Sequence, residues 1–260
     1  MKVRLQGGLG NQLFQYSFGR SLSLVRNEEL FFDKTLIEAD PQRSYSLGAY
    51  GLMLNFDPSV HGPLFVENGM PYDPRVLTTP KGTVFHGYWQ SEKYFNIPVI
   101  RKEFSRPAYE PSNATLDMAA WITEHKNSCF ISVRRGDYIR LNVALPLEYY
   151  IHGMRMIEAN YPDTHFFIFS DDEPWCVDNF KETNCTVVRS GRKDSKTECG
   201  TVHWDLWLMS LCRNAVLANS TFSWWGAWLN PREDRTVIAS KKTFPGCDIR
   251  DLFPEKWMVV

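Results

Sequence analysis

The sequence lacks the features that mark several large classes of protein. Its 29 Lys and Arg residues almost balance its 30 Asp and Glu residues, and the net charge of −1 argues against a nucleic-acid binder. No apolar run approaches the length of a membrane span, so we expect no transmembrane helix. Because no long apolar segment follows Met1, we expect no signal peptide and a cytoplasmic protein, or one held peripherally at the inner membrane surface.

Two common kinds of catalytic centre also lack their motifs. No pair among the six cysteines has C-x-x-C spacing, which argues against a zinc or redox site and favours a reducing compartment. Cys129 and Cys212 lie in apolar runs and are expected to be small buried side chains. No G-x-S-x-G turn is present, so a serine hydrolase is disfavoured and His203 is expected to be structural or part of a base pocket.

The composition is that of an ordinary globular protein, and its 260 residues suffice for one large or two medium domains. Strand-like apolar runs alternate with helical patterns along the chain, which predicts a parallel α/β architecture of two Rossmann-like lobes. We expect one lobe over residues 1–127 and a second over residues 128–260. Residues 40–82 are rich in Pro, Gly and Tyr and are expected to be irregular.

A glycine-rich loop follows the first predicted strand. Residues 3–5 are strand-like, residues 6–12 contain Gly7, Gly8 and Gly10, and apolar residues then recur at helical spacing up to Val25. A strand, glycine loop and helix in this order present backbone N–H groups to an anion. The dinucleotide fingerprint is disfavoured, because Leu13 stands where its third glycine is expected.

Residues 84–95 combine aromatic rings with hydrogen-bonding groups. His86, Tyr88, Trp89 and Gln90 could together contact a sugar, and we predict His86, Trp89 and Gln90 as contacts to an acceptor. Spacing alone favours the alternative, in which this aromatic strand simply packs on the core.

Polar clusters follow three predicted strands in the second half of the chain. They are Arg134-Arg135-Gly136-Asp137, Ser170-Asp171-Asp172 and Asn219-Ser220-Thr221-Phe222-Ser223. In a parallel sheet all three clusters open on one edge, where arginine, hydroxyl and helix N–H groups would suit a nucleoside diphosphate. Alternatively, the arginines form structural ion pairs and the Ser and Asp residues cap helices. A metal site at Asp171-Asp172 is disfavoured because the arginines already supply countercharge and a dedicated site needs more oxygen ligands.

These motifs resemble those of the bacterial-type α-1,2-fucosyltransferases, glycosyltransferase family 11. The resemblance spans nearly the whole chain, and the joint order of its segments is highly specific. The segments are residues 7–16, 87–90, 133–138, 169–172, 205–210 and 220–225.

The resemblance implies a GT-B-like fold with a cleft between its two lobes. It implies GDP-fucose as donor, bound mainly by the second lobe, and a galactose-terminated oligosaccharide as acceptor at the first. Fucose would be transferred to the 2-hydroxyl of that galactose with inversion and without an essential metal or other cofactor. The alternatives are a related transferase for another GDP-sugar or acceptor, and a non-catalytic sugar-nucleotide-binding protein.

The resemblance also assigns roles to single residues. An arginine of the Arg134-Arg135 pair would bind the diphosphate, Asp205 would contact guanine, and Asp171 is expected at the base or ribose. Further donor contacts are expected from Gly10, Asn11, Ser220, Thr221 and Phe222. Asp137 is the predicted catalytic base, with Glu92 and Glu148 as alternatives. One departure concerns donor recognition, because Ser132 stands where family members usually have histidine.

Overall fold

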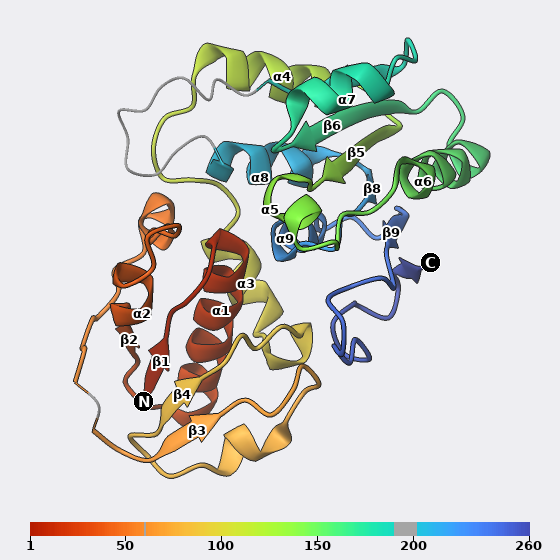
Figure 1. Ribbon diagram of the computed structural model, residues 1–260. Coiled ribbons are helices and arrows are strands. Elements are labelled where there is room, and N and C mark those ends of the chain that lie inside the picture. The colour runs from red at the N-terminus through yellow and green to blue at the C-terminus, as the bar shows by residue number, and fades with distance from the viewer. Residues whose placement is uncertain (60, 190–201) are drawn as a thin grey trace. The chain divides into compact units, whose positions relative to one another are not determined.

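The structure is a computed structural model that describes residues 1–59, 61–189 and 202–260 (Figure 1). Its contacts divide the chain into two units, Met1–Ala108 with Gly246–Pro254, and Tyr109–Pro245 with Glu255–Val260. The division falls before the predicted boundary at residue 127, because helix α4 (Asn113–Glu124) packs on α8 (Val202–Leu211) of the second unit.

The first unit is built on a four-stranded parallel sheet in the order β2-β1-β4-β3. Its strands are β1 (Lys2–Arg4), β2 (Phe31–Asp33), β3 (Leu64–Val66) and β4 (Val84–His86). Strand β3 lies in the region predicted to be irregular. It has only three residues, Leu64, Phe65 and Val66, and all are apolar, so the sequence shows no alternation of apolar and polar residues from which a strand could be predicted.

The predicted helix after the glycine loop is confirmed as α1 (Leu9–Arg26), which packs on β1. Leu13, Phe14 and Phe18 are buried along its inner face. The helix ends at Asn27, whose left-handed conformation (φ 46°) is a common helix stop. The unit also contains α2 (Thr35–Glu38), α3 (Ile97–Glu103) and three 3₁₀ turns, η1 (Leu47–Tyr50), η2 (Pro74–Thr78) and η3 (Glu92–Tyr94).

The second unit is built on a six-stranded parallel sheet in the order β10-β9-β8-β5-β6-β7. Every residue of β5 is buried, as expected for a central strand of a parallel sheet covered on both faces. The strands are β5 (Ser128–Val133), β6 (His165–Ser170), β7 (Cys185–Val187), β8 (Asn214–Val216), β9 (Val237–Ala239) and β10 (Met258–Val259).

Helices cover both faces of this sheet. On one face, Tyr150 and Ile157 of α6 (Leu147–Asn160) pack against Ile131 in a shared hydrophobic cluster. On the other, Trp121 of α4 contacts the Phe167 ring of β6, with centroids 5.6 Å apart. The remaining helices are α5 (Gly136–Arg140), α7 (Glu173–Asn179), α8 and α9 (Thr221–Trp228). The prediction of parallel α/β architecture is therefore confirmed.

Most of the tryptophans whose burial the structure describes serve the core. Trp224, Trp225 and Trp228 of α9 are at most 2% exposed, and the Trp224 and Trp228 rings stack at 5.7 Å. Cys129 and Cys212 are buried thiols as predicted, while Cys199 lies outside the described residues. Among the helices that the structure describes, none is both long and apolar enough to cross a bilayer.

Candidate active site

The three polar clusters of the second unit share one edge of its sheet, as predicted. Strands β8, β5 and β6 are neighbours, and Val133 at the end of β5 is in register with Ser170 at the end of β6. The Tyr138 hydroxyl of α5 donates to the Asn219 carbonyl at 3.3 Å, which joins the segment after β5 to the segment after β8. The carboxyl edge of a parallel sheet is the usual ligand position in α/β folds.

Asp171 organises the turn that follows β5. Its carboxylate accepts from the backbone N–H of Arg135 at 2.9 Å and of Gly136 at 3.1 Å, and it pairs with Arg134 Nη1 at 3.0 Å. A Cβ atom at Gly136 would lie 2.6 Å from Asp171 Oδ2, so a side chain there would displace the carboxylate. Asp171 therefore holds the arginine turn, and its contact to base or ribose remains a prediction.

The two adjacent arginines have different environments. Arg135 donates from Nε to Asp172 at 3.0 Å, and its guanidinium lies 4.0 Å from the centre of the Trp175 ring. Arg134 donates to Asp137 Oδ1 from Nε at 3.1 Å and from Nη2 at 2.7 Å, and its side chain is 32% exposed against 20% for Arg135. Arg135 thus braces the fold, whereas Arg134 is the arginine more accessible to a ligand.

The start of α9 supplies hydroxyl and N–H groups at the same edge. Ser220 is the N-cap, and its Oγ accepts from the Phe222 N–H at 3.3 Å. Ser223 is buried and donates from Oγ to the Ala218 carbonyl at 3.0 Å. Thr221 and Phe222 are half-buried. The capping role is therefore present, and it is compatible with a ligand at this helix terminus.

Asp205 and His203 are buried in the first turns of α8, at 5% and 0% exposure. Helix α8 packs closely on α9, since a Cβ at Gly226 would lie 2.8 Å from Met209 Sδ. Ser132 is also buried, at 5% exposure.

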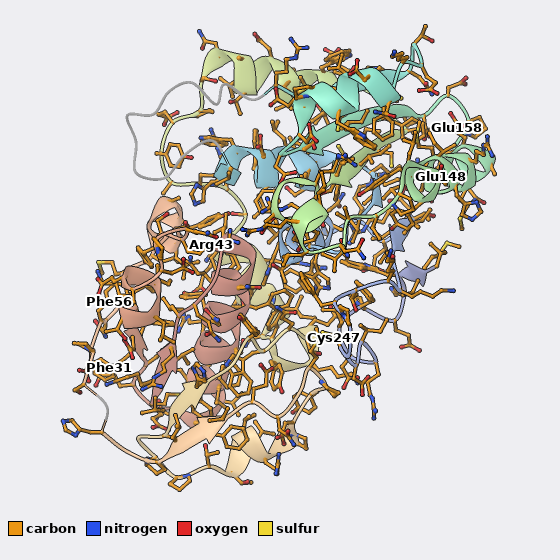
Figure 2. The ribbon with its side chains drawn as sticks, viewed as in Figure 1. Phe31, Arg43, Phe56, Glu148, Glu158 and Cys247 are labelled. Atoms are coloured by element: carbon orange, nitrogen blue, oxygen red, sulfur yellow. The ribbon has the colours of Figure 1, made fainter. Side chains whose placement is uncertain are left out.

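The two alternative bases lie in different units. Glu148 is exposed in the first turn of α6, at the right-hand side of Figure 2, and Glu92 begins η3 in the first unit.

In the first unit, the glycine loop and the segment after β4 meet. Gly7 has φ +76°, and the Asn11 side chain lies directly over it, with Nδ2 2.5 Å from where a Cβ would be. Gln90 donates from Nε2 to Asn11 Oδ1 at 3.0 Å. Gly10 is buried in the first turn of α1. Two residues predicted to have separate roles, Asn11 and Gln90, are thus direct hydrogen-bond partners.

Two buried amides in α1 hold the neighbouring loops, and sequence reasoning missed both. Gln12 donates to the Gly7 and Ser44 carbonyls, each at 2.9 Å. Gln15 accepts from the Gln6 N–H at 2.9 Å and donates to the Gly87 carbonyl at 3.2 Å. Both are 0% exposed. The sequence did carry one indication, since these two glutamines lie three residues apart and flank the apolar Leu13 and Phe14 of the same helix.

The structure corrects the prediction that Trp89 contacts an acceptor. Trp89 is 0% exposed and stacks on Phe18 at 4.1 Å, so its ring faces the core and not a ligand. Its neighbour Tyr88 is 43% exposed. His86 is half-buried, and burial together with nearby Arg4 lowers the pKa of its imidazole.

Glu67 is a further residue that the sequence did not single out. It follows β3, and its carboxylate accepts from the Tyr88 N–H at 2.6 Å and from the Trp89 N–H at 2.9 Å. Burial raises the pKa of this carboxyl to about 7. A half-buried carboxylate with a raised pKa beside a polar sheet edge is the kind of group found at functional sites.

Within the described ranges, no group of three or more His, Cys, Asp or Glu residues is arranged to hold a metal ion. The positive charge at the strand edge comes from arginine. The expectation that no metal is required remains a prediction.

Comparison with known proteins identifies the family. The sequence model of glycosyl transferase family 11 matches residues 73–258. The chain belongs to glycosyl transferase family 11. An α-1,2-colitosyltransferase of Escherichia coli is 34% identical to this transferase over 98% of the chain and 97% of that protein. The galactoside 2-α-L-fucosyltransferase SEC1 of Bos taurus is 30% identical over 96% of the chain and 69% of that protein.

A solved structure supports the fold. The family 11 chain superposes on NodZ α-1,6-fucosyltransferase, crystallised and soaked with GDP-fucose, with a TM-score of 0.54. The identity is 15%, and the match covers 88% of this chain and 92% of that one. The GT-B-like fold and the family predicted from the motifs are therefore confirmed.

Proposed function

We propose that this family 11 glycosyltransferase moves L-fucose from GDP-fucose to the 2-hydroxyl of a terminal β-galactoside, with inversion. The observation that carries the proposal is the charged strand edge, where Arg134 is partly exposed. Its guanidinium lies 5.5 Å from the centre of the Tyr138 ring, and the Tyr138 hydroxyl donates to the Asn219 carbonyl just before the N-cap of α9. Such an arrangement suits a diphosphate leaving group. The names of the E. coli and Bos taurus relatives both specify α-1,2 or 2-α transfer, which supports the 2-hydroxyl as the point of attack.

Arg134 is the residue proposed to neutralise the departing diphosphate. As the bond from the acceptor oxygen to C1 of fucose forms, the C1–O bond to phosphate breaks and GDP leaves with the electron pair. Arg134 now donates twice to Asp137 Oδ1. When the diphosphate takes over this guanidinium, the Asp137 carboxylate is released to accept the proton of the attacking hydroxyl. Glu148 and Glu92 remain the alternative bases.

Other groups would orient the two substrates. Donor contacts are proposed from Arg135, from Asp205 at guanine, and from Gly10 and Asn11. The Ser220, Thr221 and Phe222 segment would contact the phosphates and base through its side chains and N–H groups. His86 and Gln90 are proposed on the acceptor side. Because arginine supplies the countercharge, we expect transfer to continue in the presence of EDTA.

A second donor is supported by a specific observation, the 34% identity to the α-1,2-colitosyltransferase. Colitose is L-fucose without its 3-hydroxyl, so the two donors differ by one hydrogen-bonding group. A site that bonds this hydroxyl rejects the deoxy sugar strongly, whereas an apolar site discriminates weakly. The proposed enzyme is therefore tested with both donors.

The test supplies GDP-fucose or GDP-colitose with lactose and other β-galactosides, and determines the linkage of the product by NMR. An α-1,2-linked fucoside formed at the higher kcat/KM supports the proposal. A higher kcat/KM with GDP-colitose would show that GDP-colitose is the preferred donor, while the proposed transfer to the 2-hydroxyl would stand. GDP binding with no transfer from any GDP-sugar would favour a binding protein and contradict the proposed activity.

A further inference from the structure

Residues 87–90 form a loop that contains Gln90, one of the two proposed acceptor contacts, and directly follows the other, His86; we name it the 87–90 loop. Tyr88 is its exposed aromatic residue, and Gln90 bonds to Asn11 of the glycine loop. Trp89 is held in a left-handed conformation (φ +59°), which is costly for a residue with a side chain. The loop therefore depends on surrounding groups to keep its shape.

Glu67 is the group that fixes the backbone of this loop. Its two carboxylate oxygens accept separate N–H groups, Oε2 from Tyr88 at 2.6 Å and Oε1 from Trp89 at 2.9 Å. Hydrogen bonds to a charged acceptor are stronger than neutral ones. These two hydrogen bonds hold the backbone of Trp89, the strained residue, and of Tyr88, the exposed one, so they fix the position of the Tyr88 ring.

The fit between Glu67 and the loop leaves no spare space. A Cβ atom at Gly87 would lie 2.4 Å from Glu67 Cβ and 2.6 Å from its Oε2. Gln15 also contacts this loop, because it donates to the Gly87 carbonyl at 3.2 Å. Glu67 and Gln15 thus hold the loop through different backbone groups, and glycine is the residue that lets the carboxylate approach this closely.

We infer that Glu67 is a positioning residue that holds the 87–90 loop in the conformation that binds the acceptor sugar. The inference rests on the proposed function for its acceptor. Glu67 makes no ion pair among the described residues, and the titratable group facing it is the Tyr94 phenol of η3, whose oxygen accepts from the Asp73 N–H at 2.8 Å. A carboxylate whose partners are backbone N–H groups fixes the conformation of that backbone, and it does not neutralise a neighbouring positive charge.

The ionisation state of Glu67 adds a second readout. Burial raises the pKa of its carboxyl to about 7, so the group titrates in an accessible range. Above that pH both oxygens are full acceptors for the two N–H groups. Below it one oxygen carries a proton, and one of the two hydrogen bonds weakens. Acceptor binding by the wild-type enzyme should therefore weaken as the pH falls through 7.

The experiment compares Glu67→Gln with wild type and with Glu38→Gln, a control on the exposed glutamate that pairs with Lys34 in the same unit. A glutamine side chain has one oxygen and can satisfy only one of the two N–H groups. Loss of one charged hydrogen bond predicts a rise of about tenfold in the acceptor KM. The kcat and the donor KM should stay within about twofold. The acceptor KM of the variant should no longer depend on pH near 7.

Amide exchange supplies a readout that needs no turnover. The Tyr88 and Trp89 amides should exchange faster in Glu67→Gln than in wild type, and Glu38→Gln should leave them unchanged. The inference would be overturned if the acceptor KM or the amide exchange rates of Glu67→Gln equalled those of wild type. It would also be overturned if kcat fell and both KM values rose by the same factor. If the variant failed to fold, a wild-type acceptor KM that is flat between pH 6 and 8 would overturn it. Wild-type enzyme inactive with every GDP-sugar would instead contradict the proposed function, and amide exchange would still decide whether Glu67 holds the loop.

Discussion

The two sheet edges of this transferase are built in opposite ways. In the second unit, the edge is lined with charge, as Arg134 and Arg135 pair with Asp137, Asp171 and Asp172. In the first unit, the edge is held by buried amides and one carboxylate that bond to backbone groups. The first arrangement suits a charged leaving group, and the second suits a neutral sugar that must be oriented. Variants of the two edges should therefore fail in different kinetic parameters.

The largest effect is expected from Arg134→Ala. Removing a guanidinium that stabilises a developing phosphate charge should lower kcat/KM for the donor by about 10²–10³-fold. Arg134→Lys should recover part of the loss, because an ammonium retains the charge but not the fork. Arg140→Ala, which removes an exposed arginine of the same helix region, is the matched control. Steady-state kinetics with varied GDP-fucose measures the effect. Equal losses of kcat/KM in Arg134→Ala and Arg140→Ala would contradict a specific role for Arg134.

Asp171→Asn should have the next largest effect. The amide keeps the shape of the side chain but cannot accept from both the Arg135 and Gly136 N–H groups while pairing with Arg134. We expect a loss of about 10–50-fold in donor kcat/KM, since the arginine turn loses its anchor. Isothermal titration with GDP should show weaker binding. Unchanged GDP affinity would show that the turn keeps its shape without this carboxylate.

In the first unit, Gly87→Ala should act on the acceptor and on stability. Its Cβ would meet Glu67 Cβ at 2.4 Å, so the loop or the glutamate must move. We expect a loss of about 1–3 kcal/mol in the free energy of unfolding and a raised acceptor KM, with the donor KM unchanged. Urea denaturation and kinetics with varied lactose measure the two effects. Gly48→Ala is the control, because its Cβ would make an ordinary contact at 3.5 Å.

The smallest effect is expected in the pH dependence of stability. Glu67 has a pKa raised from 4.5 to about 7 in the folded protein, so it binds its proton more tightly when folded. Its contribution to stability is complete below pH 4.5 and is lost as the pH rises through 7. Glu67→Gln should abolish this contribution, which is on the order of 1–3 kcal/mol. Denaturation at pH 5 and pH 8 measures it, and an identical difference in wild type and variant would contradict the assignment.

The contrast between the edges also explains what the sequence could predict. Charged residues that directly follow apolar strands are visible in a sequence, and parallel topology then brings them to one edge. The three clusters of the second unit were predicted to meet for this reason. Which of Arg134 and Arg135 braces the fold was not predictable, because this depends on Trp175 and Asp172, which are distant in sequence.

In the first unit, the sequence pattern predicted the site residues less well than in the second. Glu67 escaped notice because its partners are backbone N–H groups 21 and 22 residues away, and a backbone group carries no sequence signature. The acceptor role of Trp89 was predicted from its residue type, whereas the spacing of the aromatic residues favoured packing on the core, and the structure agrees with the spacing. The burial of Trp89 against Phe18 is a tertiary effect.

The most direct test of the central claim measures GDP release from GDP-fucose by wild type and Arg134→Ala, with and without lactose and with and without EDTA. The account predicts release that requires the acceptor, continues in EDTA and falls at least about 100-fold in the variant. Release that is abolished by EDTA, or that is equal in Arg134→Ala and wild type, would contradict the claim that arginine at the strand edge supports the departing diphosphate.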